Sequence, residues 1–111
     1  MPADDETTQA ILKTIQTSPQ HTFSRNVLAY LSGTPDRRMR QAVAALREQG
    51  HLIVADEDGG YRLAKDANDV QRYTASLRSR IKALSKVIKA METAAKHEFG
   101  AFQQLELSVD L

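Results

Sequence analysis

Residues 24–63 read SRNVLAYLSGTPDRRMRQAVAALREQGHLIVADEDGGYRL. Ser24 and Thr34 are residue types that cap the start of a helix, and Gly33 and Gly50 are typical of a helix end. After Gly50 the apolar residues no longer recur at helical spacing and form short runs instead. The stretch therefore predicts two consecutive helices joined by a tight turn and followed by strands.

The helix expected after Ser24 is short and ends at Ser32-Gly33. Its apolar residues recur at helical spacing and are Val27, Leu28 and Leu31. Phe23, just before the cap, is placed for a hydrophobic staple contact with this helix. These residues predict one apolar face turned toward the core.

A second helix is expected from Thr34-Pro35 to about Gln49. Thr34 is predicted to cap it and Pro35 to occupy the first helical position, where a missing N–H is harmless. One apolar face is formed by Met39, Ala42, Val43 and Leu46. The opposite, exposed face is then formed by Arg37, Arg38, Arg40, Gln41 and Ala44.

A hairpin is expected next. Leu52-Ile53-Val54 and Tyr61-Arg62-Leu63 are predicted strands, and the acidic, glycine-rich residues 56–60 between them predict the turn. An earlier helix, with Asp4 and Asp5 as caps, is expected to stop at Ser18-Pro19. Its apolar stripe is Ile11, Leu12 and Ile15.

This order of elements resembles the winged helix-turn-helix domain, in particular the N-terminal domain of biotin repressors and small phage or bacterial regulators. The matching positions are Leu28-Ala29, Ser32-Gly33, Arg37-Arg38-x-Arg40, Leu46-Arg47-x-x-Gly50 and Gly60-Tyr61. The resemblance implies a mainly α (α+β) fold over residues 1–65, with three helices plus a β-hairpin. It also implies that the helix at 35–49 reads the major groove of double-stranded DNA.

The physics of the exposed helix face favours the same function. Base contacts usually come from the first turns of a recognition helix, where the arginines lie. Helix N-termini favour phosphate as well. The predicted DNA-binding residues are Ser24, Arg25, Asn26, Thr34, Arg37, Arg38, Arg40, Gln41, Ala44, Arg62 and Lys65. Arg47 lies near the end of the helix, and two roles stay open for it: contact with DNA or an ion pair with nearby acids.

One feature departs from the winged-helix pattern. The wing tip is acidic, with Asp56, Glu57 and Asp58 in sequence. Phosphate would repel these side chains. Either the wing points away from DNA, or only Arg62 and Lys65 on its return reach the backbone. A winged helix that binds protein instead is the rival interpretation.

Residues 66–99 predict a long helix that starts at Asp66 and ends at Gly100. A heptad pattern with β-branched residues mostly at position a and Leu mostly at d is typical of a two-stranded coiled coil. The predicted dimerisation residues are Val70, Thr74, Leu77, Ile81, Leu84, Ile88, Met91 and Ala95. Pairing orientation and larger bundles stay open.

Charge is distributed unevenly along the chain. The formal net charge is +1, but residues 25–89 contain thirteen basic and seven acidic side chains. Between Val70 and Met91 there is no acid, while six basic residues are present: Arg72, Arg78, Arg80, Lys82, Lys86 and Lys89. This distribution favours a polyanion partner, or an acidic one such as the chain's own C-terminal residues.

Other functions find little support. The chain has no cysteine, and its three histidines lack metal-ligand spacing, so we expect no enzyme, metal or cofactor site. No membrane span and no small-molecule ligand are expected, and a cytoplasmic, nucleoid-associated location follows. Residues 100–111 are expected to be a flexible tail or a short strand, with alternating apolar residues.

The sequence thus predicts a DNA-binding homodimer that acts as a small transcriptional regulator of bacterial or phage type. The same fold and the same DNA-binding residues would also serve a phage or plasmid replication or packaging factor that marks a DNA site. An interaction module that does not touch DNA is the alternative from a different class.

Overall fold

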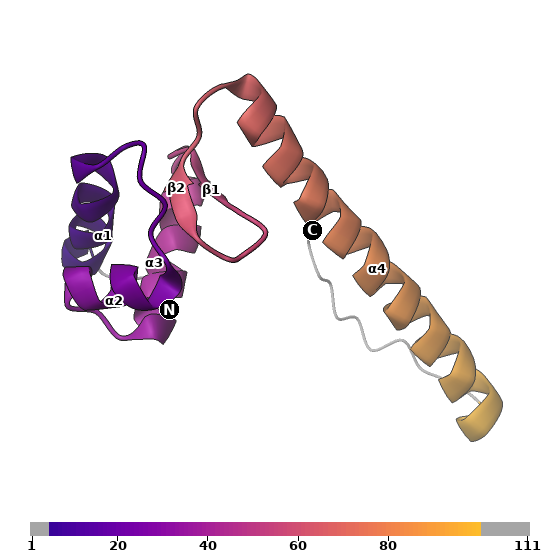
Figure 1. Cartoon of the computed structure of the whole chain (residues 1–111). Helices are drawn as coiled ribbons and strands as arrows, with labels where there is room; N and C mark the ends of the chain where they lie inside the picture. The colour runs from indigo at the N-terminus through magenta and orange to yellow at the C-terminus, as the bar shows by residue number, and fades with distance from the viewer. Residues whose placement is uncertain (1–4, 101–111) are drawn as a thin grey trace. The chain divides into compact units, whose positions relative to one another are not determined.

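The computed structural model describes residues 5–100, and the chain divides into two compact units after Thr74. In chain order the elements are α1 (Asp5–Thr17), α2 (Arg25–Ser32), α3 (Asp36–Glu48), β1 (Ile53–Ala55), β2 (Tyr61–Leu63) and α4 (Ala67–Phe99) (Figure 1). The described chain is mainly helical with one small antiparallel sheet, which confirms the coarse α+β expectation.

The ends of α2 confirm the capping prediction. The Ser24 Oγ accepts a hydrogen bond from the backbone N–H of Val27 over 3.2 Å. At the other end Gly33 has a φ of 66°, a left-handed conformation that glycine adopts without a Cβ penalty. The N–H groups of Gly33 and Thr34 donate to the carbonyls of Tyr30 and Ala29, which satisfies the last turn of the helix.

The predicted start of α3 is wrong by one residue. Pro35 is the N-cap and Asp36 is the first helical residue, so Thr34 does not cap the helix. The Thr34 side chain is buried, and its Oγ1 donates to the carbonyl of Ser32 over 3.2 Å. The tight turn after α2 therefore uses this hydroxyl, and α3 has no side-chain cap.

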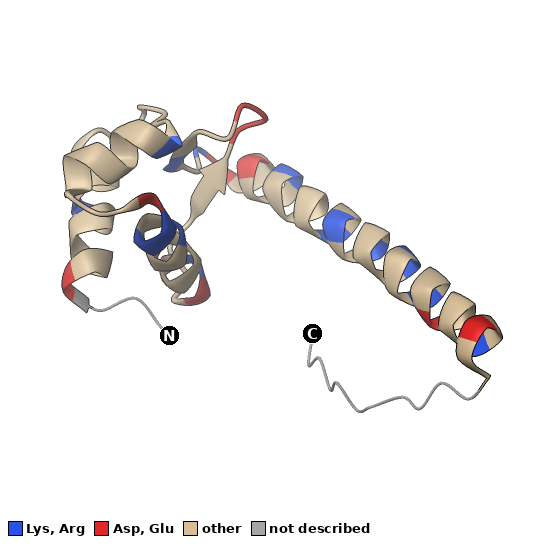
Figure 2. Cartoon of the chain, turned by 90° about the horizontal axis from the view of Figure 1, so that it is seen from below, with Lys and Arg blue, Asp and Glu red and all other residues tan. Residues whose placement is uncertain are grey.

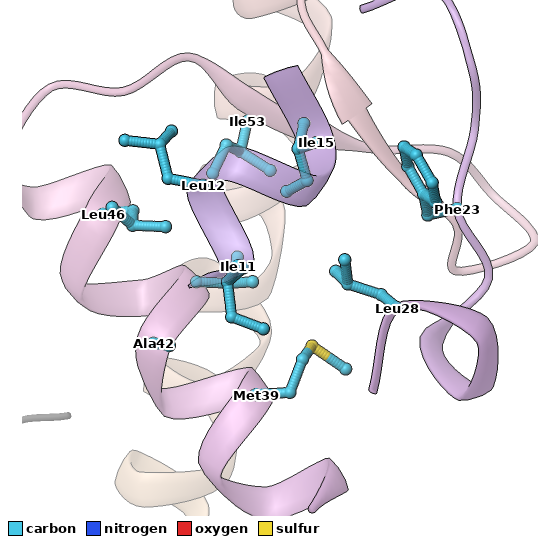
Figure 3. Packing of buried hydrophobic residues seen from close by; sticks show 10 residues of the cluster. Ile11, Leu12, Ile15, Phe23, Leu28, Met39, Ala42, Leu46 and Ile53 are labelled. Atoms are coloured by element: carbon cyan, nitrogen blue, oxygen red, sulfur yellow. The ribbon is translucent and has the colours of Figure 1, made fainter. Parts of the chain in front are cut away.

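The core of the first unit lies between α1, α2, α3 and the hairpin (Figure 3). The predicted inner face of α3 is confirmed, since Met39, Ala42, Val43 and Leu46 are almost fully buried. The predicted stripe of α1 is buried as well. Larger buried side chains from the other elements are Phe23, Leu28 and Ile53.

The predicted inner face of α2 is only partly right. Leu28 is fully buried, but Val27 and Leu31 are 44% and 55% exposed. Tyr30, one residue before Leu31, is 84% exposed. Leu28 is thus the fully buried side chain of this eight-residue helix, Ala29 packs against the core beside it, and three apolar side chains are exposed.

The hairpin pairs Ile53 with Leu63 and Ala55 with Tyr61, within one residue of the prediction. A third backbone segment adds to β2 and was missing from the sequence interpretation. Phe23 and Tyr61 exchange two backbone hydrogen bonds, each 2.8 Å long. This bridge attaches the segment before α2 to the outer edge of the sheet.

The start and end of α4 agree with the prediction. Asp66 accepts a hydrogen bond from the N–H of Asp69 over 2.9 Å, as an N-cap does. Gly100, with a φ of 79°, follows the last turn. The first compact unit nevertheless extends to Thr74 and so includes the first two turns of α4, whereas the sequence placed the domain boundary at residue 65. Residues 101–111, for which a tail or strand was expected, lie outside the described residues.

Candidate nucleic-acid interface

The outer face of α3 is polar and basic. Because its apolar residues fill the core, the predicted exposed residues are indeed exposed; these are Arg37, Arg38, Arg40, Gln41 and Ala44. Arg37 and Arg38 belong to the first turn of the helix, after Asp36. The face has the shape and chemistry that a helix needs to enter a groove of DNA.

Arg37 and Arg38 differ from the other arginines of this face. Neither side chain forms an ion pair or a hydrogen bond with any residue in the range 5–100. The helix macrodipole disfavours positive charge in the first turn by a few tenths of a kcal/mol, and no acid of the described chain pairs with these two side chains. Both guanidinium groups are therefore available to an external anion.

Arg25 and Arg40 share one carboxylate. The Nε of Arg25, at the start of α2, lies 3.0 Å from Asp36 Oδ1. The Nε of Arg40 lies 3.0 Å from Asp36 Oδ2, one turn along α3. The three side chains hold the N-termini of α2 and α3 together, and the cluster keeps a net charge of +1. All three are partly exposed, so each pair contributes about 0–1 kcal/mol to stability.

The remaining predicted residues at the helix starts separate into two kinds. Ser24 and Asn26 are exposed at the N-terminus of α2, where phosphate is favoured. Thr34 is buried, and its hydroxyl donates to the carbonyl of Ser32. Its side chain therefore shapes the turn and does not face solvent as a phosphate ligand would.

Arg62 has a different environment from the one that its sequence position suggested. Its side chain is only 13% exposed, and Nη1 lies 2.6 Å from Asp69 Oδ2 while Nε donates to Asp56 at 3.1 Å. These hydrogen bonds hold the pKa of Asp69 well below, and that of Arg62 well above, the ordinary values. Asp69 also accepts from the N–H of Lys65 and from Arg72. Arg62 thus joins the hairpin to α4, whereas the ammonium of Lys65 stays exposed.

The acidic loop of the hairpin is less negative than its sequence suggests. Asp56 is paired with Arg62 and also accepts a hydrogen bond from Thr22 Oγ1 over 3.3 Å. Asp58 accepts from the backbone N–H of Gly60 over 3.0 Å, which shapes the turn. Among the three acids, Glu57 is the one without a partner in the described part of the chain.

The side chain of Arg47, near the end of α3, packs against the hairpin and the start of α4. Its Nε donates to the carbonyl of Ile53 over 2.7 Å. Its guanidinium carbon lies 4.6 Å from the centre of the Tyr73 ring and 5.6 Å from that of Tyr61, both cation–π distances. Sequence reasoning missed Tyr73 in this role, because no local pattern links it to Arg47. These contacts give Arg47 a structural role where α3, the hairpin and the start of α4 meet.

The heptad stripe of α4 is exposed in its second half. Ile81, Leu84, Ile88 and Met91 have exposed fractions between 47% and 68%. The other predicted pairing residues are half-buried; these are Val70, Thr74, Leu77 and Ala95. Val87 and Phe99 add further exposed apolar surface to the helix.

No cluster of three or more potential metal ligands occurs within residues 5–100. No helix in that range is both long enough and apolar enough to cross a bilayer. Comparison with protein-family models, curated proteins and solved structures found no match.

Proposed function

We propose that this chain is a winged-helix protein that binds double-stranded DNA through α3 and acts as a small dimeric transcriptional regulator of bacterial or phage type. The order α1, α2, α3 and hairpin, with the bridge of Phe23 to β2, supports the winged-helix assignment. In that assignment α2 and α3 form the helix-turn-helix, and residues 53–63 form the wing.

The observation that carries the proposal is that the side chains of Arg37 and Arg38 are exposed and have no ion-pair partner in the described chain. They project from the first turn of a helix whose opposite face fills the core, and no acid of the described chain pairs with them. Guanidinium groups in this position suit bidentate contact with guanine or a clamp on phosphate. Gln41, one turn later, suits adenine.

The supporting residues have separate tasks in this proposal. Ser24, Arg25 and Asn26 at the start of α2 contact phosphate, and Arg40 adds charge while it holds Asp36. Lys65 adds a cation beside the wing. Arg62 is assigned to positioning the wing, since Asp56 and Asp69 surround it.

Pairing of α4 completes the proposed architecture. Exposed apolar side chains at positions a and d are expected to pack against a second copy of the helix. One small module makes few DNA contacts, and a dimer brings two copies of α3 to one duplex. The binding site is then an inverted repeat.

A titration of labelled duplex DNA tests the α3 assignment directly. Arg37→Ala combined with Arg38→Ala should weaken binding by at least about tenfold, because each base contact contributes roughly 1–3 kcal/mol. Lys13→Ala on the exposed side of α1 is the matched control and should bind like wild type. A folded double variant with wild-type affinity would falsify DNA binding through α3.

A protein-binding function is the second candidate. It is favoured by the exposed apolar group on α2, formed by Val27, Tyr30 and Leu31. Glu57 at the wing tip adds an acid that DNA would repel. Retained DNA binding in Tyr30→Ser combined with Leu31→Ser, together with its loss in the arginine variant, favours the DNA-binding proposal over this candidate.

A further inference from the structure

We infer that α4 has a second nucleic-acid contact, a row of four cations that binds the phosphate backbone of duplex DNA. The row is formed by Arg78, Lys82, Lys86 and Lys89, and we call it the basic row. This inference rests on the proposed DNA-binding function and adds a site to it. Figure 2 shows how Lys and Arg recur along α4.

The spacing of the basic row aligns its side chains on one side of the helix. Successive members are separated by four, four and three residues, the separations that place side chains next to one another on a helix. At a rise of about 1.5 Å per residue the row spans roughly 16 Å. Duplex DNA presents about ten phosphate charges over that length, so each cation has a phosphate within reach.

The charge of the basic row is not compensated within the described chain. All four side chains are exposed, and none has an ion-pair partner among residues 5–100. Like charges at these separations destabilise the helix. The arginine at residue 72, by contrast, lies 3.0 Å from Asp69 and is excluded from the row for that reason. Binding of an external polyanion would neutralise these four cations and so remove the repulsion between them.

The basic row and the apolar stripe occupy different sides of α4. With about 100° between successive residues, the row is centred roughly 120° from the stripe of Ile81, Leu84 and Ile88. Pairing through the stripe therefore leaves the row open to solvent. The same helix can hold a second chain on one side and a polyanion on another.

The geometry favours DNA over a lipid surface. A helix that lies on a bilayer buries its apolar side and keeps its cations at the level of the headgroups. Lys82 and Lys86 lie on the far side from the stripe and would be lifted away from anionic headgroups. The stripe also lacks the tryptophan that interfacial helices favour.

The test measures binding of the full chain to a random-sequence duplex by fluorescence anisotropy between 50 and 200 mM salt. Lys82, Lys86 and Lys89 are changed together to Gln in one variant, and together to Arg in a charge-preserving control. Each lost phosphate contact reduces the salt slope by about 0.9, so the Gln variant should lose more than about 2 units of slope. Its affinity should fall at least about tenfold at 50 mM salt, and the Arg control should keep the wild-type slope.

The arginine variant of α3, Arg37→Ala with Arg38→Ala, separates the two proposals. An unchanged slope in the Gln variant, with affinity lost in the α3 variant, overturns the basic row and leaves the proposed function standing. Affinity lost in the Gln variant alone supports the row and overturns the α3 assignment.

Two further measurements complete the test. Sedimentation should give the same mass for the Gln variant and wild type, because the stripe is untouched. A changed mass would mean that the row acts through assembly, which overturns the inference. Vesicles rich in phosphatidylserine should not bind the chain through these lysines. Row-dependent vesicle binding with an unchanged DNA slope would assign the row to a membrane instead.

Discussion

Arg62 on β2 and Asp69 in the first turn of α4 form a close pair, with Nη1 and Oδ2 2.6 Å apart and Nη2 and Oδ1 3.0 Å apart. The two parallel hydrogen bonds make this a bidentate guanidinium–carboxylate contact, the strongest kind of side-chain pair. Asp69 is only 4% exposed, so its charge depends on these partners. The pair explains why the start of α4 belongs to the first compact unit.

Asp69→Asn should lower the melting temperature at pH 7, and the difference from wild type should shrink in acid. The partners of Asp69 depress its pKa in the folded state, so the stabilisation is complete above the unfolded pKa. It is lost as the pH falls below about 4 and through the lowered folded value. Thermal unfolding followed by circular dichroism from pH 7 to pH 2 measures this. Asp66→Asn, which keeps a capping residue, is the control; an equal gap at pH 7 and pH 2 contradicts the assignment.

Gly60→Ala should reduce the free energy of unfolding by about 1–3 kcal/mol, the usual range for overpacking. A Cβ at this buried position would collide with Cγ2 of Thr22. Thr22→Ser removes that methyl group and keeps the hydroxyl that donates to Asp56. Urea unfolding of the double variant should therefore recover most of the loss, and failure to recover would place the strain elsewhere.

Asp36→Asn should raise the affinity for duplex DNA several-fold at low salt. It removes the carboxylate that Arg25 and Arg40 share and leaves both cations for phosphate. Stability should fall by no more than about 2 kcal/mol, because two partly exposed pairs of about 0–1 kcal/mol each are lost. Anisotropy titration measures the affinity, with Glu48→Gln at the other end of α3 as the matched control. Weaker binding would mean that Asp36 positions the two arginines for contact.

Two acids of the wing loop should respond differently to neutralisation. Glu57→Gln should change the free energy of unfolding by no more than about 0.5 kcal/mol, and DNA affinity should stay equal or rise. Asp56→Asn should destabilise the fold, since Arg62 and Thr22 lose a charged partner. Thermal unfolding and anisotropy on the same two samples separate these effects. A large loss of affinity in the Glu57 variant would mean that this acid makes a specific contact.

Ile81→Asp or Leu84→Asp should convert the chain from dimer to monomer, because a charge in an apolar seam is costly when buried. DNA affinity should then fall steeply through lost avidity, with every basic residue still present. In the wild-type complex the half-sites should lie about 34–36 Å apart, or a multiple of that distance. Sedimentation measures the mass and footprinting the spacing. Ala94→Asp, an exposed position away from both the stripe and the basic row, is the control, and a dimeric Ile81 variant would refute the seam.

Local signals predicted α3 well and α2 poorly, and length explains the difference. In α3 thirteen residues repeat the helical period often enough to fix the buried face of Met39 and Leu46. In α2 eight residues offer Val27, Leu28 and Leu31 as candidates, and only tertiary packing selects Leu28. A pattern this short predicts that a helix forms, but it does not determine which side of the helix faces the core.

The remaining surprises involve pairs of residues that belong to different parts of the fold. Nothing near Arg62 in sequence distinguishes a phosphate ligand from a cation already bound to Asp56 and Asp69. The contact of Arg47 with Tyr73 and the bridge of Phe23 with Tyr61 likewise depend on how the elements pack. Sequence patterns within one element carry no information on such pairs.

The bridge between Phe23 and Tyr61 has a consequence for the order of folding. Its two hydrogen bonds close a loop that contains α2, α3 and β1, whereas the hairpin closes only its own turn. Closing a long loop costs chain entropy before any contact forms, so long-range pairs tend to form late. Mutations at Phe23 should consequently speed unfolding while leaving the folding rate nearly unchanged, and mutations in the core of α3 should slow folding. The segment before α2 is thus expected to be the last part to dock and the first to detach.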